Sequence, residues 1–293
     1  MPNHSEASRR PRIAIAGATG RVGSSLVHRL VGDPVDIVAL TRDPKAVRLP
    51  SNAEIIGINF DAPPTLAEAL QGADRLFLAH GSSDRQVANE TALIDAAMDA
   101  GIGHIVKLSA MGPPTKAHPF DWHMAIEAHL ATKDLGYTVL RPGPYADILG
   151  KVGSAVAAGD WGGTAGDGLV NFIDTSDIAD VARLALLDEA SVDVQRAYHL
   201  TGPAPVTMSD VAELLSQLLE REIIYKHRTP TEQRVALIAS GFSETAADMR
   251  LGLEKLFNES VLAETTDTVE LLTKQKPRSL SDWLASNLSL FRD

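Results

Sequence analysis

The chain has 293 residues, 44% of them hydrophobic and 22% charged, so it can bury the core of a large α/β protein with one or two lobes. Its formal net charge of −11 comes without a basic block, which argues against nucleic-acid binding and favours a small-molecule substrate. The lack of cysteine excludes disulfides, thiolate catalysis and cysteine metal sites.

Residues 1–10 form a polar segment that ends in two arginines. Only six residues of buried-strand pattern follow it, too few for the apolar core of a signal peptide or for a membrane span. We therefore expect a disordered leader, a cytoplasmic location and no contact with membranes.

Short, apolar, β-branched runs then alternate with segments of helical period, most of which end in glycine. Runs without polar alternation are typical of strands buried on both faces of a parallel sheet. Their alternation with helices predicts an α/β fold with a Rossmann-type doubly wound parallel sheet. The expected strands are residues 12–17, 36–40, 53–60, 75–80, 104–109 and 137–142, and the expected helical segments are residues 23–31, 65–72, 89–101 and 124–136.

The alternation breaks after residue 150, where a glycine-rich segment occupies residues 157–168. Residues 197–202 are expected to return to the sheet as a further strand, and helical patterns dominate from Pro203 onward. We therefore expect two domains. The NAD(P)-binding Rossmann domain would comprise residues 11–144 and 170–202, and a smaller, mainly helical substrate lobe would comprise residues 145–169 and 203–293.

Three glycines, Gly17, Gly20 and Gly23, join the first strand to the first helix. In dinucleotide-binding turns the first glycine permits a tight turn, the second lets the backbone approach a pyrophosphate, and the third lets the helix pack against the strand. Amide groups at the helix start and the helix dipole then bind the phosphates. The spacing indicates such a turn, with an incidental glycine turn as the alternative.

The end of the second strand indicates which dinucleotide is preferred. Thr41 and Arg42 stand where an acidic residue would select NAD(H), so they favour NADP(H). A solvated arginine is the alternative for Arg42, and Asp43 could cap the next turn. Asn59, after the third strand, either faces the adenine or forms a turn.

Taken in order, these segments resemble the NmrA-like branch of the atypical short-chain dehydrogenase/reductase superfamily from end to end. The family includes NADP(H)-dependent quinone reductases, azo- and triphenylmethane-dye reductases, iminium reductases of alkaloid pathways, and regulators that bind the dinucleotide without turnover. The resemblance is carried by GATGRVG, TRDP, GADRLFLAH, IDAAMDAGIGHIVKLSAMG, TVLRPGPY, FIDTSDIADVA and YHLTGP.

The resemblance implies positions for the parts of the cofactor. Arg42 would bind the 2′-phosphate, and the segment from Pro142 to Tyr145 would close over the far side of the nicotinamide ring. The phosphate loop would consist of Gly17, Thr19, Gly20, Arg21, Val22 and Gly23. The nicotinamide half would lie along Ala79, His80, Gly81 and Lys107 with the three residues after it.

The catalytic tyrosine of the wider superfamily is missing. That superfamily uses a serine, a tyrosine that protonates the product, and a lysine four residues later. Ser109 matches the serine, whereas His123 and Glu127 occupy the tyrosine and lysine positions, and the chain has no Tyr-x-x-x-Lys. Histidine can act as an acid near neutral pH, with Glu127 orienting its ring. A structural His–Glu pair or substrate binding without proton transfer are the alternatives. His118 is a second candidate, but it lies in a flexible proline-flanked loop, where a histidine without a catalytic role is the expected alternative.

The substitution also bears on the substrate. Ketone reduction needs a positioned acid for the developing alkoxide, whereas an iminium ion, quinone or cationic dye needs less help. We therefore expect an NADPH-dependent reductase of conjugated or cationic small molecules. The alternatives are an NADP(H)-binding regulator without turnover and an isomerase or cyclase on the same fold. The substrate contacts would come from Met111, Trp122, Tyr145 and Trp161, with a place in the hydrophobic core as the alternative for the three aromatic residues.

Other features are expected to be structural or absent. Asp174 and Asp177 fit loop and helix-cap positions, because Asp at a helix start satisfies open N–H groups. The nine histidines form no recognisable ligand motif, so no metal is expected. A homodimer is one candidate assembly.

Overall fold

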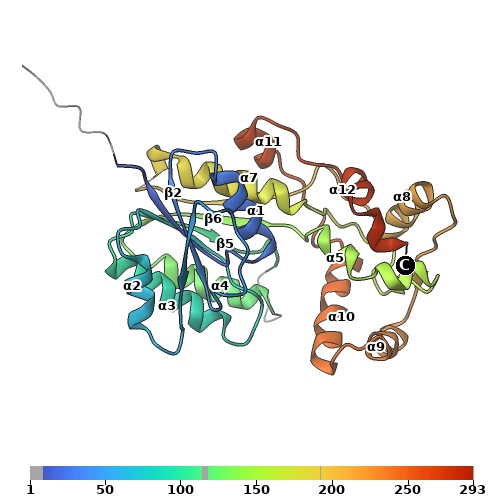
Figure 1. Ribbon diagram of the computed structural model, residues 1–293. Coiled ribbons are helices and arrows are strands. Elements are labelled where there is room, and N and C mark those ends of the chain that lie inside the picture. Colours follow the sequence, from blue (N-terminus) through green and yellow to red (C-terminus); the bar gives the residue numbers. More distant parts are fainter. Residues whose placement is uncertain (1–8, 114–117, 192, 293) are drawn as a thin grey trace, which may run out of the picture. The chain divides into compact units, whose positions relative to one another are not determined.

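The computed structural model describes residues 9–113, 118–191 and 193–292, whose path Figure 1 shows. The chain forms two compact units. The first unit holds the chain up to Leu108 together with Ala125–Val139 and Ala182–Ala197. The second holds Ser109–Met124, Leu140–Val181 and the chain from Tyr198 onward. The predicted division into a dinucleotide lobe and a substrate lobe concerns ligands and stays a prediction.

A seven-stranded sheet has the order β3-β2-β1-β4-β5-β6-β8. Its strands are β1 (Arg12–Ala16), β2 (Asp36–Thr41), β3 (Ala53–Gly57), β4 (Arg75–Leu78), β5 (His104–Leu108), β6 (Gly136–Pro142) and β8 (Gln195–Leu200). The pairings of β1 with β2 and β4, of β2 with β3, and of β4 with β5 are parallel. The strand order reverses beside β1, which confirms the doubly wound fold and marks the edge where such sheets bind ligands.

The helices agree with the predicted order, and the strand expected at residues 197–202 does return to the sheet as β8. The helices are α1 (Arg21–Leu30), α2 (Pro64–Leu70), α3 (Gln86–Asp99), α4 (Phe120–Leu130), α5 (Asp147–Gly150), α6 (Gly153–Ala157), α7 (Thr175–Leu187), α8 (Met208–Leu219), α9 (Pro230–Ala239), α10 (Glu244–Asn258), α11 (Thr268–Thr273) and α12 (Leu280–Ser286), with 3-10 turns η1 (Glu189–Ser191) and η2 (Leu288–Phe291). In the described parts of the chain no helix is both long and apolar enough to cross a bilayer.

The core of the first unit forms because its central strands are apolar on both faces. Every residue of β4 is buried, and so are four of the five residues of β1. Leu26 and Leu30 of α1 are fully buried one turn apart, which gives this helix the apolar stripe of an amphipathic helix. Figure 1 shows α1 on one face of the sheet and α2 and α3 on the other.

The expectation that every strand is buried on both faces is wrong for β3. Ala53 is buried, but Glu54 and Ile55 are exposed. The reason is that β3 lies at the edge of the sheet and pairs only with β2. The burial of a strand depends on its neighbours, which its own residues do not encode. Of the predicted disordered leader, residues 1–8 lie outside the described residues, and Arg9 forms a 2.6 Å ion pair with Asp74.

The second unit has its own core, and from Pro203 onward it is mainly helical as predicted. The glycine-rich segment is packed against this core. It contributes β7 (Gly162–Gly163), which pairs with β9 (Lys226–His227) in a small parallel sheet. A Cβ on Gly168 would lie 2.0 Å from the carbonyl oxygen of Phe257, so glycine permits this close approach of two backbones.

Candidate functional site

The β1–α1 turn, taken as residues 17–23 with the first residues of α1 included, has no room for a side chain at two of its glycines. Gly17 has a φ of +78°, which residues with side chains rarely adopt, and a Cβ there would lie 2.7 Å from the carbonyl oxygen of Ala79. A Cβ on Gly23 would lie 2.1 Å from the carbonyl oxygen of Gly17. The backbone therefore closes tightly around the start of α1, as it must where a diphosphate approaches.

Backbone contacts also fix the start of α1. Gly20 N donates to Gly17 O at 2.9 Å. The first amide groups of a helix have no acceptor in a preceding turn, and with the helix dipole they favour an anion. Thr19 and Arg21 are exposed on this turn, while Val22 is buried beneath it. The predicted phosphate loop is thus one continuous, sterically closed turn.

Arg42 follows β2 directly and is exposed, whereas Thr41 ends the strand and is buried. The hydroxyl of Thr41 accepts from Asp43 N at 3.2 Å, and the Asp43 carboxylate accepts from Lys45 N at 3.1 Å. Asp43 therefore caps the next turn, as predicted. Arg42 is the basic side chain beside the carboxyl end of β2, where the adenine ribose lies in this fold.

Asn59 lies two residues beyond β3 and forms a turn. Its side-chain oxygen accepts from Asp61 N at 2.9 Å, and its N–H donates to the Thr65 hydroxyl at 3.2 Å. The turn-forming alternative therefore describes Asn59 in the structure. A contact between Asn59 and adenine stays a prediction.

His80 lies after β4 and is fixed by three contacts. Its Nδ1 is 2.6 Å from the Gly81 carbonyl oxygen, and its Nε2 is 2.9 Å from Nδ2 of Asn89 on α3. Phe60 packs edge-on against the ring, with the centroids 5.8 Å apart. The residue before it, Ala79, is the one whose carbonyl oxygen faces Gly17. These contacts give His80 a defined position, and its contact with the cofactor stays a prediction.

Lys107 has a buried partner that the sequence analysis missed. Its ammonium group lies 2.8 Å from Glu90 Oε2 on α3, and both side chains are fully buried. Lys107 also donates to the Leu108 carbonyl, and Gln86 donates to Glu90 Oε1 at 2.9 Å. The sequence did hint at a buried polar partner, because the spacing of Gln86, Asn89 and Glu90 places three polar side chains on one helix face. Contact of Lys107 with the cofactor stays a prediction.

In the second unit the segment after β5 runs beside the end of β6. Ser109 N donates to Leu140 O at 2.7 Å, and Met111 N donates to Pro142 O at 2.8 Å. Ser109 is 3% exposed and Met111 is 5% exposed, so both side chains are held within the fold. Tyr145 lies half-buried shortly after Pro142. The structure thus brings together Ser109, Met111 and Pro142, while their roles stay predictions.

Trp161, predicted to contact the substrate, is buried in the core of the second unit. Its ring packs edge-on against Tyr225, with the centroids 5.1 Å apart. Burial, reinforced by the Glu254 carboxylate, raises the pKa of Tyr225 to about 12, so the phenol is neutral at physiological pH. A hollow of about 110 Å³ beside Trp161 is smaller than the roughly 300 Å³ that small-molecule sites need. A substrate contact at Trp161 stays a prediction.

Helix α4 begins at Phe120, before the predicted start of the helical segment, and ends at Leu130. His123 and Glu127 lie on it four residues apart, which places them on one face. Both side chains are half-buried. The structure therefore confirms their shared helix, while a catalytic role stays a prediction.

A second histidine at the start of α4 has a partner that the sequence analysis missed. His118 Nδ1 lies 2.7 Å from Asp121 Oδ1. The imidazole ring also stacks on the indole of Trp122, with the centroids 4.2 Å apart and an interplanar angle of 20°. The same carboxylate oxygen accepts from Trp122 N at 2.9 Å, so both the ring and the carboxylate have defined orientations.

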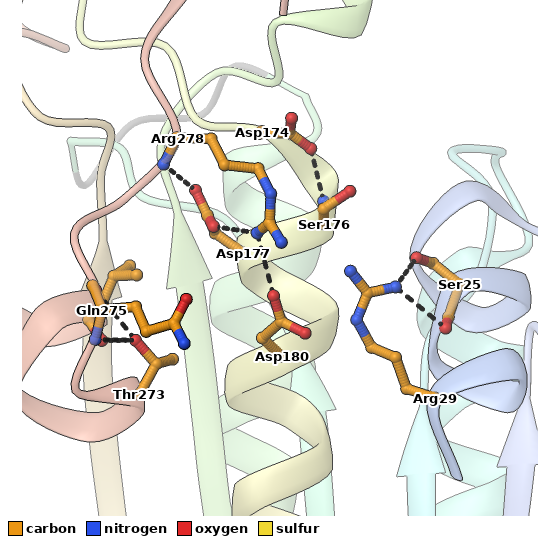
Figure 2. Close-up of polar contacts among 10 residues, drawn as sticks. Ser25, Arg29, Asp174, Ser176, Asp177, Asp180, Thr273, Gln275 and Arg278 are labelled. Atoms are coloured by element: carbon orange, nitrogen blue, oxygen red, sulfur yellow. Dashed lines mark hydrogen bonds and ion pairs between the residues drawn. The ribbon is translucent and has the colours of Figure 1, made fainter. Parts of the chain in front are cut away.

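The two acidic residues at the start of α7 both make structural contacts, and the predicted capping contact is made by Asp174 (Figure 2). Asp174 accepts from Ser176 N at 2.7 Å, which is a capping contact. Asp177 instead accepts from Arg278 N at 2.8 Å and from the Arg278 guanidinium, which also contacts Asp180 at 2.9 Å. Burial raises the pKa of Asp177, and Arg278 partly offsets this by stabilising the charged form. Asp177 thus ties the segment before α12 to α7.

Comparison with known proteins agrees with this architecture. Residues 17–189, which begin at the β1–α1 turn, match a protein family described as NAD(P)H-binding. An NAD(P)H azoreductase from Xenophilus azovorans is 29% identical over 284 residues, covering 95% of this chain and 99% of the relative. Quinone oxidoreductase 2 from Escherichia coli (strain K12) is 30% identical over 244 residues, covering 81% of this chain and 85% of the relative.

A solved structure shares the fold over most of the chain. The triphenylmethane reductase of Citrobacter sp. has a TM-score of 0.86 at 22% identity, covering 95% of this chain and 99% of that one. The family match spans more than half of the residues and includes the glycine turn. The chain therefore belongs to the NAD(P)H-binding family, within the NmrA-like branch of the atypical short-chain dehydrogenase/reductase superfamily.

Proposed function

We propose that this protein is a reductase that uses NADPH in preference to NADH and transfers hydride to a conjugated or cationic small molecule. Quinones, azo compounds and iminium ions are the acceptor classes. The observation that carries the proposal is the β1–α1 turn, where backbone atoms exclude side chains at Gly17 and Gly23. Relatives named as an azoreductase and a quinone oxidoreductase match over most of their own length, which supports a reductase.

Different residues would bind the cofactor and the acceptor. A bound nicotinamide supplies the hydride. The β1–α1 turn would hold the diphosphate, and Arg42 would pair with a 2′-phosphate through its guanidinium. Ser109, whose main chain is fixed beside β6, would donate a hydrogen bond to the acceptor. The lack of a Tyr-x-x-x-Lys pair supports acceptors whose reduction leaves little localised negative charge.

The reductase is tested by following the absorbance band of NADPH against a panel of quinones, azo dyes, triphenylmethane dyes and cyclic imines. We expect acceptor-dependent oxidation of NADPH with at least one class. Tight NADPH binding without oxidation by any acceptor would contradict this and favour a regulator. Formation of product without consumption of NADPH would instead favour an isomerase or cyclase.

The preference for NADPH is expected to depend on Arg42. Arg42→Ala should raise the dissociation constant of NADPH by about 10- to 100-fold, because a hydrogen bond to a charged group contributes roughly 1.5–3 kcal/mol. NADH, which lacks the 2′-phosphate, should bind both proteins alike. Calorimetric titration with the two cofactors measures the difference. Arg234→Ala removes the same charge in the second unit and is the matched control. An equal loss of affinity for both cofactors would contradict this role.

A further inference from the structure

The contact between His118 and Asp121 has the geometry of a proton-transfer pair. A carboxylate can only accept, so the 2.7 Å contact requires the proton on Nδ1 when the imidazole is neutral. This leaves Nε2, on the opposite edge of the ring, as the atom that gains and loses a proton. A carboxylate in this position both selects the tautomer and stabilises the imidazolium.

Two further contacts hold the ring in place. The indole of Trp122 stacks on one face of the imidazole. Trp122 N also donates to Asp121 Oδ1, the same oxygen that contacts His118 Nδ1. The His118 side chain is nevertheless 47% exposed, so a small molecule can reach it. The pair is therefore ordered and accessible at once.

The position of the pair in the second unit also favours a role beside the acceptor. A Cβ on Gly112 would lie 2.1 Å from the ring of Phe120, so the segment that follows Ser109 and Met111 packs against the start of α4. His118 lies two residues before that start. The segment that carries Ser109 and the one that carries His118 are thus in contact within one unit.

His129, which lies on α4, lacks these features. His129 Nε2 lies 2.8 Å from Asp95, but the same carboxylate oxygen is 2.6 Å from Lys133. Lys133 already provides Asp95 with a positively charged partner. The contact between His129 and Asp95 therefore serves to link α3 to α4. His129 therefore provides a matched comparison for His118.

We propose that His118, positioned by Asp121, is the residue that supplies a proton to the acceptor during reduction. The inference rests on the proposed reductase function. Hydride brings two electrons to one atom of the acceptor, and the imidazolium form of His118 passes its Nε2 proton to the heteroatom that receives the electron pair, which leaves the neutral Nδ1–H tautomer. The neutral imidazole then regains a proton from water. Asp121 is a positioning residue, because it acts through the imidazole.

This role predicts a dependence on the kind of acceptor. A quinone or an azo compound needs one hydride and one proton, and the proton must come from the enzyme or from water. A triphenylmethane dye cation needs only the hydride, because its addition gives a neutral product. Loss of the proton donor should therefore slow the first class and spare the second.

The test compares kcat for a quinone and for a triphenylmethane dye in single-residue variants. His118→Gln should lower kcat for the quinone by about 100-fold, a usual contribution of a general acid. With the dye, the kcat of His118→Gln should equal that of the control variant, His129→Gln. Asp121→Asn should show the same selectivity to a smaller degree. NADPH affinity, measured by titration, should be unchanged in all three variants.

The outcomes separate this inference from the proposed function. If the wild-type protein oxidises no NADPH with any acceptor, the reductase proposal itself fails. If the wild type is active but His118→Gln loses both acceptors equally, or neither, the inference alone is overturned. A selective loss in His123→Gln in place of His118→Gln would likewise overturn it and assign the proton to His123.

A second measurement needs no turnover. Ring ¹⁵N spectra distinguish the two neutral tautomers of histidine, and the His118 signals are assigned by their loss in His118→Gln. At a pH where the ring is neutral, the wild type should show the Nδ1–H tautomer, and Asp121→Asn should shift the ring toward Nε2–H. A wild-type ring in the Nε2–H form would overturn the role of Asp121 and with it the proposed pair.

Discussion

Replacing Gly23 with alanine is expected to raise the dissociation constant of NADPH by more than about 100-fold, or about 2.8 kcal/mol. The added Cβ would lie 2.1 Å from the Gly17 carbonyl oxygen and 2.8 Å from its carbon. Both atoms are backbone, so relief requires opening the turn. Opening would move the amide groups at the start of α1 away from the diphosphate. Calorimetric titration with NADPH measures the loss.

The control for this variant is Gly32→Ala, because a Cβ at Gly32 would meet nothing within 4 Å. Gly23→Ala is also expected to lower thermal stability, so a second variant keeps the turn closed. Gly20 has a φ of −78°, which any residue adopts, and a Cβ there would lie 3.2 Å from the Gly17 carbonyl oxygen, which a shift of a few tenths of an ångström relieves. Gly20→Asp would place a carboxylate where the diphosphate is expected. NADPH binding by Gly20→Asp at wild-type affinity would contradict the assignment of this turn.

The fold was predictable from sequence for those strands whose own residues are apolar on both faces. β1 and β4 are apolar on both faces because helices cover both, and such runs stand out in the sequence. β3 has a similar run, yet three of its five residues are exposed because it pairs on one side only. The strands β7 and β9 span two residues each, too few to show any period.

The candidate site was likewise predictable from sequence only in part. The glycine turn was predictable because one of its steric constraints, the close approach of Gly23 to Gly17, acts within a few residues. The contact of Lys107 with Glu90 joins residues far apart in the chain, and only the buried face of α3 hinted at it. His118 was identified as a candidate, but its pairing with Asp121 depends on the path of the chain into α4. Sequence spacing alone does not fix that path.

Replacing Lys107 with methionine is expected to destabilise the protein by about 3–5 kcal/mol, the usual cost of leaving a buried charge without its partner. Lys107 and Glu90 are both fully buried and 2.8 Å apart, so the Glu90 carboxylate would lose its cation with no access to water. Its remaining partner, Gln86, is neutral. Equilibrium unfolding in urea measures the change.

The double variant Lys107→Met with Glu90→Met should recover most of this stability, because two apolar side chains of similar volume remove both desolvation costs together. Lys255→Met is the matched control: Lys255 and Glu259 lie 3.6 Å apart with side chains 74% and 48% exposed, so the loss there should be far smaller. If the double variant were as unstable as Lys107→Met alone, the pair would not act as a unit. Lys107 would then stabilise the fold chiefly through the Leu108 carbonyl, next to Ser109.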